Sequence, residues 1–400
     1  MIYLDNHATT RLDPRVLEAM LPWLTDHYGN AGSVTHEPGR EAREAVEQAR
    51  ATFAAAIGAV PREIVFTGGA TESTNLAILG SAARQTGGGH LVTVVSEHHA
   101  VLDPVEHLER QGMAVTRLPV IRQRDEDGAA GIPGRIRLAD LDAALRPGGF
   151  LVSILLANNE IGVVQEVAEI AARVHAAGGI LHVDCAQAIG RLRVHVDELG
   201  ADLASFSAHK FHGPKGAGVL YVRRRGRAVR IEPLVYGGGQ ERGLRSGTLD
   251  VPAIVGVAKA VELADAELAG ERPRVRGLRD RLWAALRTRI QGVELNGPSL
   301  DATDSAGEPV RLVNNLNVRV DGVDGQTLLA TLSNAGIAVS SGSACSSESP
   351  RPSHVLLALG LDEDQARASL RFGLSRFTTE AEIDEAAETI AAGVARLRSL

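Results

Sequence analysis

One lysine stands among residue types that suit covalent chemistry. Lysine supplies three of the 42 basic side chains, at positions 210, 215 and 259, and arginine supplies the others. Lys210 lies in residues 207–216, which read SAHKFHGPKG. A lysine can form a Schiff base with a carbonyl or accept a proton once its pKa is lowered, whereas an arginine stays protonated. The placement of Lys210 therefore predicts a catalytic amine, and a surface lysine kept by chance is the alternative.

An aspartate at the end of an apolar run is the second candidate. Asp184 directly follows the run at residues 180–183, and a carboxylate buried there requires a cationic or hydrogen-bonding partner. If Lys210 carries pyridoxal phosphate, an aspartate is the group that keeps the pyridine nitrogen protonated and makes the ring an electron sink. A simple cap on the following helix is the alternative.

A glycine-rich turn predicts an anion site. Residues 67–73, TGGATES, join an expected strand to an expected helix and include Ala70 and Thr71. Backbone amides and the positive end of a helix dipole can hold a phosphate at such a turn. Neither a Walker pattern nor a dinucleotide Gly-x-Gly-x-x-Gly pattern is present, which disfavours nucleotide binding. An ordinary capped helix that contains Thr71 is the alternative.

Histidines occur in two pairs that suggest either metal binding or acid–base work. His98 and His99 are adjacent, and His209 and His212 are three residues apart. A zinc site would need a further ligand and would leave Lys210 without a role, so no metal is predicted. We expect His98 to lie over a cofactor ring and to act as a general acid.

The two cysteines differ in their surroundings. Cys345 lies in the small polar run at residues 340–347, which indicates an exposed loop and a reactive thiol, with a tolerated surface thiol as the alternative. Cys185 follows a buried strand and is interpreted as a core thiol. Two such cysteines give neither a disulfide framework nor a zinc spacing.

Arg371 interrupts an apolar strand. Its guanidinium is suited to bind a substrate carboxylate through two parallel hydrogen bonds. Arg376 is a second candidate for the same task, and a salt bridge to the closing helix is the structural alternative for both.

The composition is that of a large globular chain. It has 400 residues, 44% of them hydrophobic, and a net charge of −7, which argues against nucleic acid as the main ligand. No apolar stretch is long enough to span a membrane, and the first residues lack the pattern of a signal peptide. The expected location is the cytoplasm.

The candidate residues fall at the ends of expected strands. Five apolar runs end in small polar residues, at residues 64–66, 91–95, 152–156, 180–183 and 203–206, and helix-period segments separate most of them. This alternation predicts an α/β fold with a mostly parallel sheet covered by helices, and ligands bind at the carboxyl ends of such strands. After residue 251 we expect long charged helices at 253–268 and 274–290, and then a smaller α+β domain.

Seven segments together resemble the pyridoxal-phosphate cysteine desulfurases, and the match extends over nearly the whole chain. They are residues 3–10 (YLDNHATT), 69–73 (GATES), 97–98 (EH), 158–162 (NNEIG), Asp184 with Gln187, 207–210 (SAHK) and 245–248 (RSGT). The run at 341–345, SGSAC, resembles the long catalytic loop of the first desulfurase group. Within the class V aminotransferases, this resemblance implies the fold-type I architecture.

The resemblance also implies roles for individual residues. Lys210 is the expected Schiff-base lysine of pyridoxal 5′-phosphate, Asp184 binds the pyridine nitrogen, Gln187 binds the ring hydroxyl, and His98 stacks on the ring. Thr71, Ser207 and His209 bind the phosphate, Thr248 reaches it from a second subunit, and Ala70 completes the cofactor site. Asn159, also at the cofactor, and Arg371 hold the substrate carboxylate.

The expected reaction converts L-cysteine to L-alanine and leaves a persulfide on Cys345 for acceptor proteins such as an iron–sulfur scaffold. A homodimer with shared sites is implied. The expected parts are an N-terminal segment at 1–14, a large cofactor-binding domain at 15–255 and a small domain at 256–400 that carries Cys345. The alternatives are a selenocysteine lyase, another pyridoxal-phosphate lyase or aminotransferase of this fold, and a non-catalytic sulfur carrier or scaffold.

Overall fold

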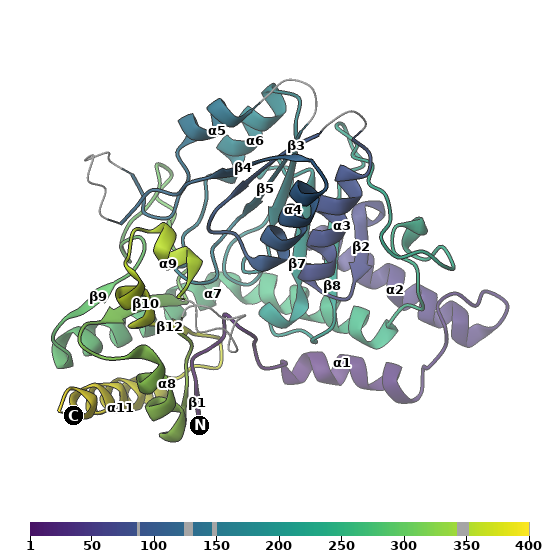
Figure 1. The fold of residues 1–400 in the computed structure, drawn as a ribbon. Coiled ribbons are helices and arrows are strands. Elements are labelled where there is room, and N and C mark those ends of the chain that lie inside the picture. The colour runs from purple at the N-terminus through teal and green to yellow at the C-terminus, as the bar shows by residue number, and fades with distance from the viewer. Residues whose placement is uncertain (86–88, 124–130, 146–149, 342–351, 400) are drawn as a thin grey trace.

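The computed structural model describes residues 1–85, 89–123, 131–145, 150–341 and 352–399. A seven-stranded sheet forms its centre, in the order β2-β8-β7-β6-β5-β3-β4. Its strands are β2 (Ile64–Thr67), β3 (His90–Val94), β4 (Ala114–Leu118), β5 (Phe150–Leu155), β6 (Ile180–Asp184), β7 (Leu203–Ser207) and β8 (Gly218–Val222). The strands from β3 to β7 are mutually parallel, and β8 is antiparallel to both β7 and β2. This arrangement confirms the predicted mostly parallel α/β sheet (Figure 1).

Helices cover both faces of the sheet, which is why most of its strands are continuous apolar runs. They are α2 (Glu37–Ala56), α3 (Ala70–Ala82), α4 (His99–Arg110), α5 (Leu138–Ala144) and α6 (Val167–Ala176). Side chains of α2 and α6, such as Phe53 and Ile170, pack in one core with Val183 and Phe206 of the sheet. The helices α3 and α4 pack on strand residues of the opposite parity, such as Leu91. Asp184 lies one position after Val183, so its side chain is on the face that α3 and α4 cover.

A smaller group of elements follows along the chain. In it β10 (Asn315–Val320) lies between β9 (Val293–Leu295) and β12 (Ser369–Gly373), antiparallel to both. Its helices are α8 (Gly325–Asn334), α9 (His354–Ala358), α10 (Glu363–Arg367) and α11 (Glu380–Arg398). The N-terminal strand β1 (Ile2–Tyr3) pairs in parallel with β11 (Ile337–Ala338), and Ile2 and Leu4 belong to the apolar core of these elements. The first residues thus pack with the C-terminal part of the chain, while the predicted boundaries at residues 14 and 255 stay a prediction.

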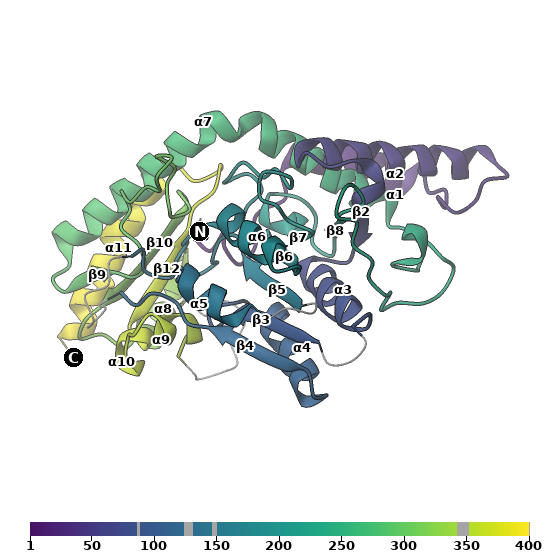
Figure 2. The same ribbon diagram turned by 90° about the horizontal axis from the view of Figure 1, so that it is seen from above.

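One long helix joins the two groups. The sequence predicts two helices here, but α7 (Val251–Arg289) is continuous over 39 residues and contains Pro273 (Figure 2). Proline inside a helix removes one hydrogen bond and costs about 3 kcal/mol. Both halves of α7 are nevertheless packed, because Val257 lies in the core of the large sheet and Leu282 lies in the core of the C-terminal elements. Packing at both ends therefore outweighs the local preference for a break.

Short elements complete the chain: α1 (Pro14–Thr25) and the single turns η1 (Pro61–Glu63), η2 (Ala208–Lys210) and η3 (Glu241–Gly243). Within the described ranges, no helix combines the length and the apolar character that crossing a membrane requires.

Candidate active site

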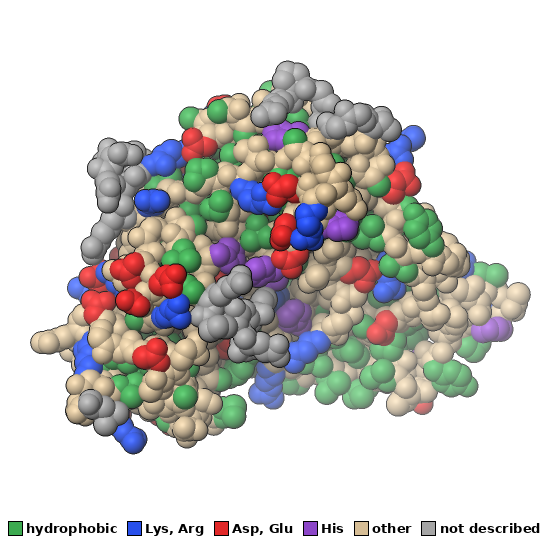
Figure 3. All heavy atoms as spheres, viewed as in Figure 1, with side chains coloured by type: hydrophobic (Ala, Val, Ile, Leu, Met, Phe, Trp, Pro, Cys, Tyr) green, Lys and Arg blue, Asp and Glu red, His purple; other side chains and the backbone are tan. Residues whose placement is uncertain are grey.

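A cavity of about 740 Å³ opens where the carboxyl ends of the central strands meet. Nine of the predicted site residues line it: Ala70, Thr71, His98, Asn159, Asp184, Gln187, Ser207, His209 and Lys210. They come from five separate strand ends and from the helices that follow. Figure 3 shows histidine side chains close together near the centre of this face of the molecule. The strand-end rule therefore brings residues that are far apart in the sequence to one place.

Lys210 reaches the cavity because β7 ends just before it and the chain turns through η2. Its Nζ donates hydrogen bonds to the backbone oxygens of His7 and Ala8, at 2.6 and 2.7 Å. These carbonyls come from the N-terminal segment that packs with the C-terminal elements. The amine is therefore positioned by main-chain acceptors from a distant part of the sequence, at the wall of the cavity.

Asp184 is the last residue of β6 and is only 3% exposed. Its Oδ1 accepts a hydrogen bond from the backbone N–H of Ala186 at 2.8 Å. Burial raises the pKa of Asp184 from 3.8 to about 6, although the Ala186 hydrogen bond and the charge of Lys210 act in the opposite direction. The carboxylate is still mostly ionised at neutral pH, at a cost that a cationic group in the cavity would offset.

The turn before α3 has the backbone geometry for binding an anion. Gly69 has a φ of 149°, which favours glycine, and no side chain among the described residues caps the helix that begins after it. The first N–H groups of a helix have no acceptor within the helix, so here they are free to bind an anion. A Cβ at Gly218 would lie 2.5 Å from backbone atoms of Gly69, so the close approach of β8 to this turn requires glycine.

Two further polar groups lie along the same wall. Ser207 is 4% exposed at the end of β7. A hydrogen bond of 3.0 Å joins His209 Nδ1 to Thr9 Oγ1. Burial, followed by the charges of Lys210 and Lys215, lowers the pKa of His209 to about 4, so it is a neutral hydrogen-bonding group at pH 7.

His98 caps α4 and faces the cavity. Its Nδ1 accepts a hydrogen bond from the backbone N–H of Ala100 at 3.0 Å, which leaves the ring proton on Nε2. Burial and then the charge of Lys210 lower the pKa of His98 to about 4. The imidazole is therefore neutral at pH 7, with a fixed tautomer.

Gln187 makes a contact that sequence reasoning missed. Its amide forms two hydrogen bonds with His7, a residue noted in the sequence only as part of the N-terminal motif. The two residues are 180 positions apart, and no spacing or periodicity links them. The pairing of β1 with β11, which the sequence pattern does not reveal, is part of what positions His7.

The two arginine candidates have different surroundings. Arg371 is fully buried on β12, does not line the cavity, and pairs with Asp5 at 2.8 Å and with the Asn159 carbonyl at 3.2 Å. Among the described residues, its Nε has no hydrogen-bond partner. The structure thus places Arg371 next to Asn159, and their joint role in binding a substrate carboxylate stays a prediction.

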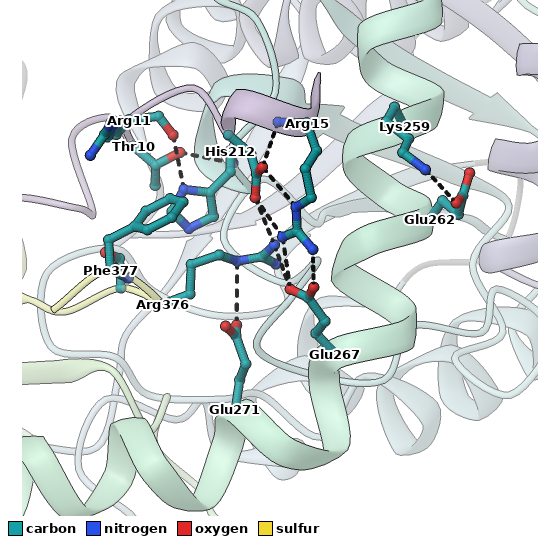
Figure 4. A network of polar contacts seen from close by, with 12 residues as sticks. Thr10, Arg11, Arg15, His212, Lys259, Glu262, Glu267, Glu271, Arg376 and Phe377 are labelled. Atoms are coloured by element: carbon teal, nitrogen blue, oxygen red, sulfur yellow. Dashed lines mark hydrogen bonds and ion pairs between the residues drawn. The ribbon is translucent and has the colours of Figure 1, made fainter. Parts of the chain in front are cut away.

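Arg376 belongs to a network of ion pairs outside the cavity (Figure 4). It pairs with Asp13 at 3.3 Å, with Glu267 at 2.7 Å and with Glu271 at 3.5 Å. Asp13 is the N-cap of α1, and both glutamates lie on α7. The structure therefore favours a salt-bridge role for Arg376, which was the alternative to binding a substrate carboxylate. Its partners lie at α1 and α7, however, and not on the closing helix α11.

The remaining site predictions fall outside this cavity. Thr248 is exposed and does not line it. Cys345 lies outside the described residues. Cys185 is 1% exposed, and burial, followed by the charge of Asp184, raises the pKa of its thiol well above the usual value. The described part of the chain contains no group of three or more histidine, cysteine or acidic side chains that could hold a metal ion.

Comparison with known proteins agrees with this geometry. The model of the family described as aminotransferase class-V matches residues 2–386. Cysteine desulfurase IscS of Anaeromyxobacter dehalogenans (strain 2CP-C) is 50% identical over 400 residues, which cover 100% of this chain and 94% of that protein. Cysteine desulfurase IscS of Escherichia coli O139:H28 (strain E24377A / ETEC) is 49% identical over 402 residues, with the same coverage.

A solved structure of a NifS-like protein superimposes on this fold with a TM-score of 0.87 and 37% sequence identity, and covers 99% of this chain and 100% of that one. Full-length similarity at this level, together with a family model that spans almost the whole sequence, establishes the relationship. The chain belongs to the class V aminotransferases and, within them, to the cysteine desulfurase family.

Proposed function

We propose that this protein is a cysteine desulfurase that uses pyridoxal 5′-phosphate. The overall reaction converts L-cysteine and the thiol of Cys345 into L-alanine and a persulfide on Cys345. One S–S bond forms as the C–S bond of the substrate breaks, and the proton balance closes within these four species. The observation that carries the proposal is the placement of Lys210 and Asp184 in one cavity with an uncapped helix N-terminus.

The side chains around the cavity fit this cofactor. The first turn of α3 with Thr71, together with Ser207 and His209, would hold the phosphate. Asp184, a buried carboxylate whose pKa is raised to about 6, would hold the protonated ring nitrogen. When bound through Lys210, the cofactor supplies an electron sink for the carbon next to the substrate amine. The phosphate is thereby matched by hydrogen-bond donors at a helix N-terminus, and the ring nitrogen by a carboxylate.

The protein's own residues direct the proton movements. Lys210 is the group that takes a proton from the substrate once its amine is free. His98, neutral and carrying its proton on Nε2, is the group that we assign to proton transfer near the substrate sulfur. Asn159 and Arg371 would orient the substrate through its carboxylate.

The sulfur acceptor is the thiol of Cys345. A thiolate is the reactive form, and an ordinary thiol with a pKa of about 8.5 is only partly ionised at neutral pH. Cys185 is unsuited to this task, because burial raises the pKa of its thiol and leaves it 1% exposed. The two cysteines are therefore assigned different roles.

A homodimer is supported by an unpartnered apolar face. The leucines at positions 17, 21 and 24 of α1 are 42%, 48% and 56% exposed, and their spacing places them on one side of the helix. Apolar side chains are visible along the lower edge of Figure 3, where Figure 1 places α1. A second copy would cover this face, and Thr248, which does not reach its own cavity, would serve the partner's.

Acceptors of the persulfide sulfur, such as an iron–sulfur scaffold protein, complete the proposed cycle. The choice among acceptor pathways stays a prediction from the family resemblance, as does the cytoplasmic location.

The experiment is a comparison of two serine variants. Cys345→Ser is expected to bind cofactor and L-cysteine but to release no sulfide in the presence of a reductant. Cys185→Ser is the matched control and is expected to retain sulfide release. Normal turnover by Cys345→Ser, or loss of turnover confined to Cys185→Ser, would overturn the assignment.

A further inference from the structure

His7 is a fully buried side chain that the proposed chemistry does not use. Its ring lies between Gln187, which lines the cavity, and Asn315 on β10. The distance from His7 Nδ1 to Gln187 Oε1 is 3.1 Å, and the distance from His7 Nε2 to Asn315 Nδ2 is also 3.1 Å. The ring thus connects an element of the C-terminal part of the molecule to the wall of the cavity.

The direction of these hydrogen bonds is fixed from the Asn315 end. Arg311 is buried, and its guanidinium donates to Asn315 Oδ1 from Nε at 3.1 Å and from Nη2 at 2.8 Å. Because a guanidinium only donates, the oxygen of the Asn315 amide must face Arg311. The Nδ2 group of Asn315 then donates to the Glu160 carbonyl at 2.9 Å and to His7 Nε2.

It follows that the ring proton of His7 is on Nδ1. Nε2 accepts from Asn315, so Nδ1–H donates to Gln187 Oε1. The other end of the Gln187 amide agrees with this, because its Nε2 donates to the backbone oxygen of His7 at 2.9 Å, and a carbonyl only accepts. Gln187 is therefore held in one amide orientation by two separate contacts with His7.

Burial first, and then the positive charges around it, keep His7 neutral. Burial is the main cause that lowers its pKa well below 6.5, and the positive charges of Arg191, Arg371 and Lys210 act in the same direction. A neutral ring has one donor and one acceptor, which is what the two neighbouring amides require. The chain of contacts from Arg311 to Gln187 is thus fully matched in donors and acceptors.

We propose that His7 is a positioning residue which fixes the Gln187 amide so that one N–H points into the cavity. Of the two hydrogens on Gln187 Nε2, one is held by the His7 carbonyl, and the second is left for an acceptor in the cavity. The ring oxygen of pyridoxal phosphate is an acceptor of this kind. The inference rests on the proposed function, and it adds a residue that acts on the cofactor through another side chain.

The test is a pH titration of the visible absorbance of the holoenzyme. The ring oxygen of the bound cofactor shares a proton with the Schiff-base nitrogen, and a hydrogen-bond donor stabilises the oxygen most after that proton has left. Losing the donor therefore makes the proton harder to remove and raises its pKa, which is the spectral pKa. His7→Leu is expected to raise the spectral pKa by about 0.5 to 1 unit, the effect of one neutral hydrogen bond. His7→Gln again offers one donor and one acceptor. This variant is expected to keep the spectral pKa close to the wild-type value.

Two asparagines on β10 supply a matched control. Both Asn315 and Asn317 are buried and donate to the Glu160 carbonyl, but only Asn315 contacts His7. Asn315→Ala is expected to shift the spectral pKa in the same direction as His7→Leu, and Asn317→Ala is expected to leave it unchanged.

An unchanged spectral pKa in both His7→Leu and Asn315→Ala would overturn the inference, as would an equal shift in Asn317→Ala. A wild-type protein that takes up no pyridoxal phosphate would instead overturn the proposed function. The two failures are therefore distinguishable.

Discussion

Replacing Asp184 by asparagine is expected to stabilise the cofactor-free protein. Burial raises the pKa of Asp184 from 3.8 to about 6, so the folded state holds a charge that the unfolded chain accommodates more easily. A shift of about 2 units corresponds to about 3 kcal/mol at neutral pH. Because the folded-state pKa lies above the unfolded one, the cost is present above pH 6 and disappears as the pH falls below about 4. Asp184→Asn removes this cost at neutral pH.

The assay is thermal unfolding of the cofactor-free protein at pH 7.5 and at pH 5. Asp184→Asn is expected to raise the melting temperature by a few degrees at pH 7.5 and by less at pH 5, and to weaken cofactor binding. Asp202 is the matched control. It is equally buried, but its carboxylate accepts a hydrogen bond from the Leu181 backbone at 2.9 Å and contacts His175 at 2.9 Å.

Asp202→Asn is expected to lower the melting temperature, because the folded protein already gives this carboxylate a cationic neighbour, Arg223, at 3.8 Å from its Oδ1, besides the two contacts of its Oδ2. If Asp184→Asn lowers the melting temperature of the cofactor-free protein as Asp202→Asn does, then Asp184 is a structural cap, and the reasoning that assigns it to a cationic ligand is refuted.

Three further predictions concern the periphery of the site. Leu21→Glu on α1 is expected to convert a dimer into monomers, as measured by sedimentation. An unchanged molecular mass would contradict the proposal that this face of α1 forms the dimer interface. Asp13→Asn is expected to lower the free energy of unfolding in urea by about 2 kcal/mol at pH 7, since Arg15 first and also Arg376 hold the pKa of Asp13 at about 2. That depressed pKa means the difference shrinks as the pH falls from 4 toward 2, and a constant difference would contradict it. Arg371→Lys is expected to raise KM for L-cysteine about 10- to 100-fold through loss of a bidentate contact, whereas Arg376→Lys leaves KM unchanged, and equal effects would argue against a substrate role for Arg371.

The central sheet and the location of the cavity were predictable from the sequence. Apolar runs that end in small polar residues correspond to β2, β3, β5, β6 and β7, and the rule for parallel sheets places their carboxyl ends together. The pattern missed β4 and β8. Strand β4 is partly exposed, which dilutes its apolar character, and β8 follows β7 through the single turn η2 and a loop, without an α-helix between them.

Contacts between distant segments could not be predicted. The contact between His7 and Gln187 depends on how the N-terminal strand pairs with β11, and no local pattern encodes that pairing. The continuity of α7 through Pro273 is a similar case, because packing at both ends of the helix opposes a local signal. Arg371 was predicted from its position in an apolar strand, but its pairing with Asp5 was not.

The most direct test of the account is to find which residue carries the cofactor. The holoenzyme is reduced with borohydride and digested, and the modified peptide is sequenced by mass spectrometry. A phosphopyridoxyl group is expected on Lys210. With only two other lysines in the chain, a group found on Lys215 or Lys259, or no modified lysine at all, would contradict it.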